Sequence, residues 1–237
     1  MPQKLINAAK VNEVFAHLNE NQDNSELYSA VEHGDDIVGQ IKGLTLAPGY
    51  RIVRVDDRLS DKISQQHFEL ALLNDVTKEV AYYNRVVIQP DTVLKCRPVS
   101  QILVWRTLKR EHRAALHDLA GQVFFGYLLE RYDVIVSDMN QTHDGMSFWQ
   151  ARMYDALAYK CYVYAYDVMS GELRPIKDED DVGREEMWLW GDPEHHQHRL
   201  AIISKIPLPK LDEDKVDHEE VKIKNLFSSL SRTKLLS

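Results

Sequence analysis

Residues 99–167 constrain the fold more tightly than any other part of the chain. They read as an apolar strand over residues 101–105, a long helix, a short apolar strand over residues 134–136, a second helix and a closing strand over residues 161–166. Two strands joined through a helix of this length pair in parallel with a right-handed crossover. The first helix is indicated by apolar residues at the spacing of one helix face: Leu116, Leu119, Ala120, Val123, Phe124, Tyr127 and Leu128.

Three further strands are predicted upstream of this unit. Residues 50–55 alternate in polarity, and residues 67–74 and 79–87 form a hairpin around a turn at residues 75–78. Downstream, the second helix begins near Asp144, a good N-cap residue, and carries Trp149, Met153, Ala156 and Leu157 on one face. Antiparallel strands followed by a parallel unit predict an α/β fold with a mixed sheet and helices on both faces.

The two ends of the chain differ in character from the middle. We divide the chain into an N-terminal helical extension (1–45), a central domain (46–206), and an acidic linker with a C-terminal helix (207–237). The first extension holds a helix-like stretch from Leu5 to Leu18 and a short helix around residues 26–31, and the last helix carries Leu226 and Phe227. Within the domain, we expect an acidic loop at residues 178–186 and an edge strand at residues 200–203.

Composition excludes several classes of protein. The formal charge of −8 argues against broad, sequence-independent binding of nucleic acid. The two cysteines, Cys96 and Cys161, form no CxxC motif, so neither a zinc finger nor a disulfide framework is indicated. We see no apolar signal core and no stretch long enough to span a membrane, so we expect a soluble, cytoplasmic protein.

Two stretches near residue 190 could have a function, one rich in tryptophan and one rich in histidine. Adjacent His195 and His196 do not converge easily on one ion, and no HExxH helix is present, so no metal site is predicted there. Trp188 and Trp190 alternate as on a strand, which favours packing, with a dimer interface and a covering flap both left open.

The turn after residues 101–105 is basic in an otherwise acidic chain. Arg106, Lys109, Arg110 and Arg113, with His112, precede the predicted first helix, and helix N-termini attract anions. A site for a phosphate-bearing ligand and a solvated helix start are the two alternatives. Similarly, the polar residues that follow residues 134–136, including Asp138, either bind a ligand or cap the next helix.

In this order, residues 50–167 resemble the GNAT family of N-acetyltransferases, and more narrowly the divergent GNAT-like proteins of bacteriophages. The hairpin resembles the second and third strands of the family, residues 101–105 the fourth, and residues 134–138 the fifth. The basic turn takes the place of the pyrophosphate loop, while Gly145 and Trp149 lie near two residues of the family's Asn-x-x-Ala-x-x-Tyr region.

The resemblance implies a splayed sheet and acyl-CoA-dependent transfer of an acyl group, such as that of acetyl-CoA, to an amine. It implies that the backbone around Ile102, Val104 and Trp105 pairs with pantetheine, and that Tyr154 protonates the departing thiolate. A carboxylate or a water near the cleft is the general base, with Glu69 and Asp138 as candidates. It also implies that four basic residues hold the phosphates: Arg106, Lys109, Arg110 and Arg113.

The chain departs from the family in one respect. The pyrophosphate loop of the family is glycine-rich, whereas residues 106–120 contain no glycine. Either the basic side chains replace the backbone amides, or the cofactor site has been lost. The competing hypothesis is therefore a catalytically inactive GNAT-like phage protein that acts as a virion component or binds a host factor. A GNAT-like enzyme that modifies nucleobases is a third alternative, against which the net charge argues.

Overall fold

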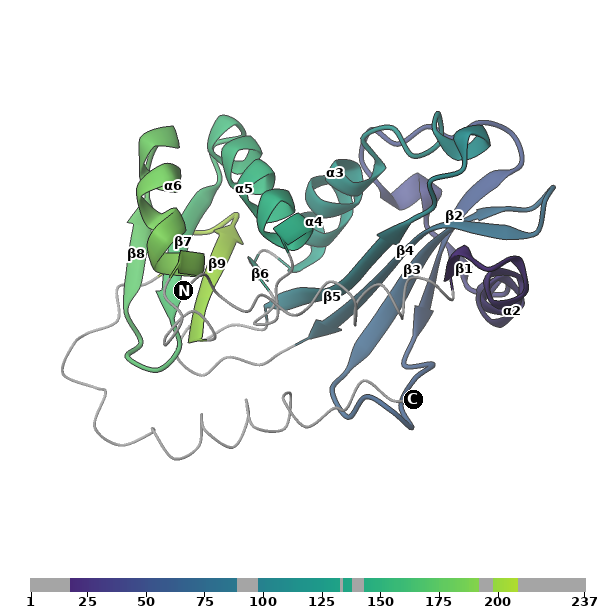
Figure 1. Cartoon of the computed structure of the whole chain (residues 1–237), viewed down its shortest axis with the longest axis horizontal. Coiled ribbons are helices and arrows are strands. Elements are labelled where there is room, and N and C mark those ends of the chain that lie inside the picture. Colours follow the sequence, from purple (N-terminus) through teal and green to yellow (C-terminus); the bar gives the residue numbers. More distant parts are fainter. Residues whose placement is uncertain (1–17, 89–97, 133, 138–142, 192–197, 209–237) are drawn as a thin grey trace.

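The protein folds as a mixed α/β structure around an open mixed sheet (Figure 1). The computed structural model describes residues 18–88, 98–132, 134–137, 143–191 and 198–208. Within these residues, nine strands form one sheet in the order β1-β2-β3-β4-β5-β6-β9-β7-β8. None of the described helices is both long and apolar enough to cross a membrane.

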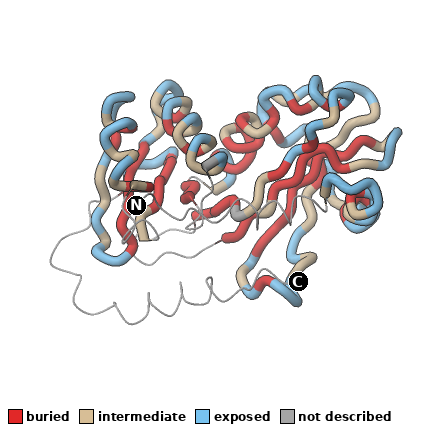
Figure 2. Tube along the Cα trace, in the orientation of Figure 1, coloured by how far each residue is buried: buried red, intermediate tan, exposed pale blue. Residues whose placement is uncertain are grey.

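The first half of the sheet is an antiparallel run of consecutive strands. It comprises β1 (Asp35–Asp36), β2 (Tyr50–Asp56), β3 (His67–Asn74), β4 (Glu79–Ile88) and β5 (Val99–Arg106). The three upstream strands predicted from the sequence are confirmed. Strand β3 is buried at every position, and β4 is rich in the β-branched and aromatic residues that fit a pleated surface (Figure 2).

The second half begins with β6 (Val134–Val136), which pairs with β5 in parallel as predicted. Strand β9 (Arg199–Ser204) lies antiparallel between β6 and β7 (Tyr162–Asp167), and β8 (Leu173–Ile176) forms the outer edge. The predicted edge position of residues 200–203 is therefore wrong. All of them are buried, as in a strand whose two faces are both covered.

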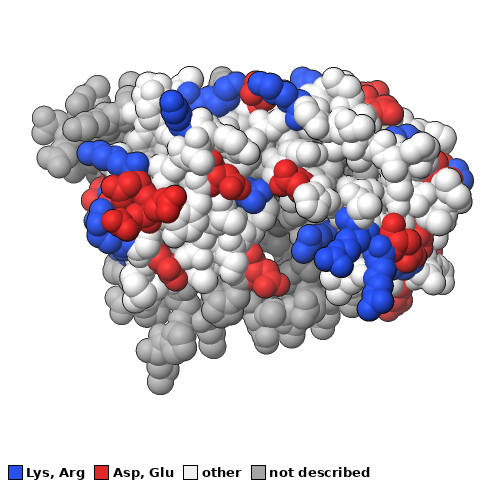
Figure 3. Space-filling view, turned by 90° about the horizontal axis from the view of Figure 1, so that it is seen from above, with Lys and Arg blue, Asp and Glu red and all other residues white. Residues whose placement is uncertain are grey.

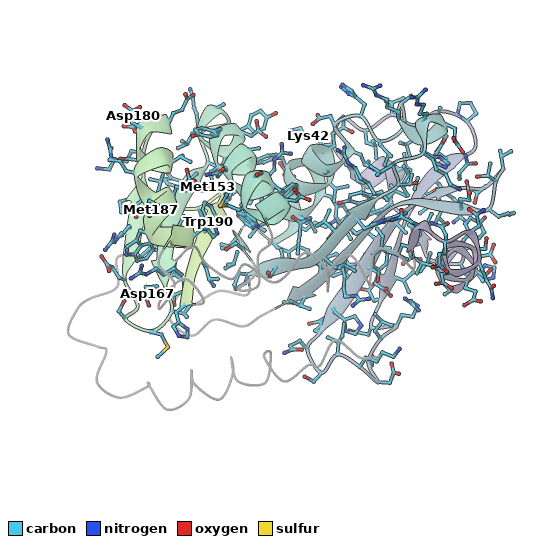
Figure 4. The ribbon with its side chains drawn as sticks, in the orientation of Figure 1. Lys42, Met153, Asp167, Asp180, Met187 and Trp190 are labelled. Atoms are coloured by element: carbon cyan, nitrogen blue, oxygen red, sulfur yellow. The ribbon has the colours of Figure 1, made fainter. Side chains whose placement is uncertain are left out.

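Helices cover both faces of the sheet. On one face lie α3 (Leu119–Val123), a π-helical segment (Phe124–Leu128), α4 (Leu129–Tyr132), α5 (His143–Ala158) and α6 (Glu179–Glu186) (Figure 1). Met153 of α5 and Trp190, which follows α6, lie in the main core beneath these helices (Figure 4). On the other face, α2 (Asn21–Val31) packs Tyr28 and Val31 against a separate cluster that includes Tyr83 and Trp105.

The first long helix begins later than the sequence pattern predicts. The apolar stripe that predicts the helix begins at Leu116, but Arg110–His112 form a short 3₁₀ turn and α3 starts at Leu119. Asp118 adopts a left-handed conformation (φ 53°), which interrupts the helical path just before Leu119.

The predicted acidic loop at residues 178–186 is in fact the helix α6. The Asp178 side chain accepts a hydrogen bond from the backbone N–H of Asp181 at 2.8 Å and so caps the helix. Acidic residues in the first turn, Glu179 and Asp180 among them, favour the helix dipole. The strand reading of Trp188 and Trp190 is also wrong, because both lie in a π-helical turn (Met187–Gly191).

Several predicted features fall outside the described residues. They are the helix-like stretch from Leu5 up to residue 17, Asp138, the histidines His195 and His196, and the C-terminal helix with Leu226 and Phe227.

Candidate functional site

The most open part of the sheet is the point where β5 and β6 part. Two residue pairs join the strands, Val99 with Ile135 and Ser100 with Val136. Beyond Ser100, β5 continues to Arg106 while pairing only with β4 among the described strands. An extended edge of this kind offers N–H and C=O groups to another extended chain of amides.

The backbone of this edge is irregular at one position. Arg85 pairs with Leu103 and Val86 with Gln101, so the register passes over Ile102 as a β-bulge. The side chains of the other two predicted edge residues point into the protein. Trp105 is buried in the cluster beneath α2, and Val104 packs against the main core. The edge can therefore recognise a ligand through its backbone.

Three of the four predicted phosphate-binding residues are exposed at the end of β5 and on the turn that follows it. Arg106, Arg110 and Arg113 are exposed, and none forms an ion pair with another described residue. Seen from above, Lys and Arg side chains gather on the half of the molecule that holds strands β1 to β5 (Figure 3). Three unneutralised guanidinium groups close together in sequence can bind an anion.

Lys109, the fourth, has a different role. Its ammonium group donates to the Glu79 carboxylate and, at 3.2 Å, to Oδ1 of Asn21. Its charge is thus used to tie the turn to β4 and α2, so Lys109 does not join the three arginines.

Three backbone amides of the basic turn are used within the turn itself. The N–H of Lys109 donates to Oγ1 of Thr107 at 3.3 Å, and those of His112 and Arg113 donate to the carbonyls of Lys109 and Arg110 at 3.2 and 3.1 Å. These amides are not free to cradle a phosphate, which agrees with the lack of glycine. Anion binding here falls to the side chains.

His112 does not face the arginines. The side chain is fully buried, with Nδ1 2.9 Å from the Tyr50 hydroxyl and Nε2 3.2 Å from Oε2 of Glu79. Burial acts to raise the pKa of Glu79, but hydrogen bonds from Lys109, Thr77 and His112 outweigh it and lower that pKa.

The structure does not bring Glu69 and Tyr154 together. Tyr154 lies on α5 and is 40% exposed. The Glu69 carboxylate is fully buried, and Arg58 binds both of its oxygens, at 2.6 and 2.7 Å, while the Tyr83 hydroxyl also donates to it. Since Phe68 and Leu70 on either side face the main core, Glu69 faces the opposite side of the sheet from α5.

The structure instead places a different polar group beneath the helices. Tyr82 and Asn84 alternate on β4 and so share a face, and Gln101 lies on the same face of β5, opposite Val86. All three are buried, and neither the Tyr82 hydroxyl nor the amide groups of Asn84 and Gln101 have a hydrogen-bond partner among the described residues. Leaving such groups unpaired costs about 1–3 kcal/mol each, which marks them as ligand or water contacts.

An arginine from α5 completes this polar group. Burial raises the pKa of the Tyr82 phenol, and the Asn84 side chain and the positive charge of Arg152 oppose that rise only in part. The Arg152 side chain is 16% exposed and binds Asp155 at 2.8 Å. Tyr82 therefore stays protonated at neutral pH and can donate a hydrogen bond. In the sequence, Asn84 is the one sign of this group, because asparagine is disfavoured in strands and here interrupts an apolar run.

No protein-family model matches the chain, and no curated protein matches it.

Proposed function

We propose that the protein is an acyl-CoA-dependent N-acyltransferase of the GNAT type found in bacteriophages. The observation that carries the proposal is the parting of β5 from β6 after two residue pairs, which leaves a strand edge that leads directly into a turn with exposed arginines. The sheet is mixed, with β9 antiparallel between β6 and β7, and this order is compatible with the sheet that the resemblance implies.

The residues present fit an acyl-CoA through two sets of contacts. Backbone groups of Ile102 to Trp105 would pair with the amides of pantetheine, and Arg106, Arg110 and Arg113 would bind its phosphates. When bound, the cofactor supplies the acyl group as a thioester. The β-bulge at Ile102 bends the strand next to the opening, which helps it to diverge from β6.

The proton transfers need a donor and a base near the same opening. The Tyr154 hydroxyl is the proposed proton donor, because it lies on the helix that follows β6 and is accessible. Glu69 is occupied by Arg58 and Tyr83 on the far face. The proposed base is therefore a water held by the Tyr82 hydroxyl and the Asn84 amide, through which the proton of the amine leaves.

The second candidate is a GNAT-like scaffold without catalysis that binds a protein. The use of the turn's own amides within the turn favours it, because the backbone then offers phosphates little. In this case the three arginines would contact an acidic partner surface, such as that of a host factor or a virion protein.

Calorimetric titration with acetyl-CoA separates the two candidates. The enzyme requires saturable binding, with stabilisation of about 2.7 kcal/mol when the ligand is at 100 times its Kd. The double variant Arg110→Ala/Arg113→Ala should lose most of that affinity. A control, Lys177→Ala/Arg184→Ala, removes the same charge beside α6 and should bind normally. No binding at millimolar acetyl-CoA would overturn the proposed activity, and equal binding by both variants would overturn the phosphate site.

A further inference from the structure

Two carboxylates and one imidazole converge at the basic turn. They belong to Glu79 at the start of β4 and to Glu111 and His112 of the 3₁₀ turn. One ligand atom from each lies within 4.8 Å of the other two. His112 is buried, Glu79 is half-buried and Glu111 is exposed, so the group has a fixed base and one side open to solvent.

The imidazole is oriented by its hydrogen bonds. Nδ1 lies 2.9 Å from the Tyr50 oxygen, and that hydroxyl is 3.5 Å from the carbonyl of Glu111. Without an ion, Nε2–H can donate to Glu79 and Nδ1 can accept from the Tyr50 hydroxyl. Binding of an ion would move the imidazole proton to Nδ1, where the Tyr50 oxygen accepts it while the Tyr50 hydroxyl turns to the Glu111 carbonyl. The lone pair of the imidazole is then on Nε2, which is the usual arrangement around a metal-bound histidine.

The spacing of the two innermost atoms also suits a shared cation. Nε2 of His112 and Oε2 of Glu79 are 3.2 Å apart. Two ligands on a tetrahedral ion with bonds of about 2.0 Å lie roughly 3.3 Å apart. Lys109 binds the other oxygen of Glu79, Oε1, so Oε2 is left for the imidazole side.

The local charge and space fit a divalent ion. Lys109 neutralises one of the two carboxylates, so the site keeps a net negative charge with a neutral imidazole. A cavity of about 10 Å³ adjoins Glu79 and His112 and is lined by Asn21, Asn24 and Thr107. It is the size of one water molecule, which can serve as a fourth ligand.

We propose that Glu79, Glu111 and His112 bind a divalent transition-metal ion of the zinc class. The ligands are Oε2 of Glu79, a carboxylate oxygen of Glu111 and Nε2 of His112. A nitrogen ligand favours zinc-like ions over Mg²⁺ and Ca²⁺, which prefer oxygen alone. Bound there, the ion joins β4 to the turn, independently of acyl-CoA.

The test is a calorimetric titration of tag-free, chelator-treated full-length protein with ZnCl₂. We expect one ion per chain and a rise in the melting temperature. Glu111→Gln is the primary variant, because the residue is exposed and its replacement should leave the metal-free melting temperature unchanged. It should lower the affinity by at least roughly tenfold. His112→Gln should remove binding.

A control protects the assignment from the other histidines of the chain. The variant His195→Ala/His196→Ala should bind zinc like the unchanged protein. Titration with MgCl₂ should give no binding at the same concentrations. The proposal is overturned if the unchanged protein does not bind zinc, if Glu111→Gln binds it with full affinity, or if the two adjacent histidines account for the bound ion.

Discussion

Arg58 and Glu69 form a two-fold hydrogen-bonded ion pair, at 2.6 and 2.7 Å, on the face of the sheet opposite α5. The carboxylate is fully buried and also accepts from Tyr83, whose hydroxyl receives hydrogen bonds from Arg85 at 3.1 and 3.3 Å. This network explains why a charged residue can lie within the fully buried strand β3, and it gives Glu69 a structural role.

Arg58→Met should therefore destabilise the protein by about 3 kcal/mol, because it leaves a buried carboxylate without its partner. Adding Glu69→Leu should restore most of that loss. Urea unfolding of the single and double variants measures both effects. If Arg58→Met unfolds at the same urea concentration as the unchanged protein, the ion pair contributes nothing and our account of Glu69 is wrong.

Stability should also depend on the charge of Asp75. The hydrogen bond from Arg51 at 2.8 Å lowers the pKa of Asp75 below its ordinary value of 3.8, helped by the Tyr28 hydroxyl at 2.7 Å. A carboxyl with a lowered pKa stabilises the folded state above its ordinary pKa, and that contribution is lost as the pH falls through the lowered value.

Asp75→Asn should accordingly reduce stability at pH 7, and the difference from the unchanged protein should shrink as the pH falls below about 3.8. Thermal unfolding from pH 7 to the most acidic pH at which the protein remains folded tests this. A difference that stays constant over this range would contradict the account.

Two glycines in helical segments should respond to alanine with opposite signs. A Cβ on Gly126, in the π-helical segment, would lie 2.9 Å from the backbone carbonyl oxygen of Lys42. The N–H of Lys42 also donates to the carbonyl of Gly126, which holds the two backbones together. Gly126→Ala should destabilise the protein by about 1–3 kcal/mol. A Cβ on Gly183 of α6 would meet nothing within 4 Å, so Gly183→Ala should stabilise it by about 0.5–1 kcal/mol. Equal effects in urea unfolding would contradict the close approach at Gly126.

The buried polar group of Tyr82, Asn84 and Gln101 should lower the stability of the protein while supporting its activity. Asn84→Leu replaces a buried amide without a partner by an apolar side chain, so stability should stay equal or rise by about 1 kcal/mol. Acyl transfer to an amine should slow, since the water proposed as base loses a contact. A variant that is less stable and equally active would show that the amide is structural.

The strands were the most predictable part of the fold. Residues 67–74 and 79–87 are long and β-rich, and their pattern specifies both the hairpin and its burial. The central position of β9 was not predictable, because an apolar run such as 200–203 does not indicate which distant strands it joins. The start of α3 depends on the left-handed conformation of Asp118. The sequence does not reveal it, because the apolar spacing continues from Leu116 to Leu119.

The location of the candidate site could be predicted from the sequence, but the roles of its individual residues could not. The turn after β5 stood out by charge, yet the pairing of Lys109 with Glu79 depends on two residues 30 positions apart. Gln101 and Asn84 came together only through the register of β4 and β5. The carboxylate of Glu69 makes it a candidate base by sequence, but the ion pair with Arg58 depends on the folded structure.

Hydrogen–deuterium exchange with and without acetyl-CoA tests the central claim most directly, because it reports on the backbone of β5. The account predicts that saturating acetyl-CoA slows exchange in Gln101 to Arg106 and leaves β8, the outer edge of the sheet, unchanged. Unaltered exchange in residues 101–106 at saturating acetyl-CoA would contradict it.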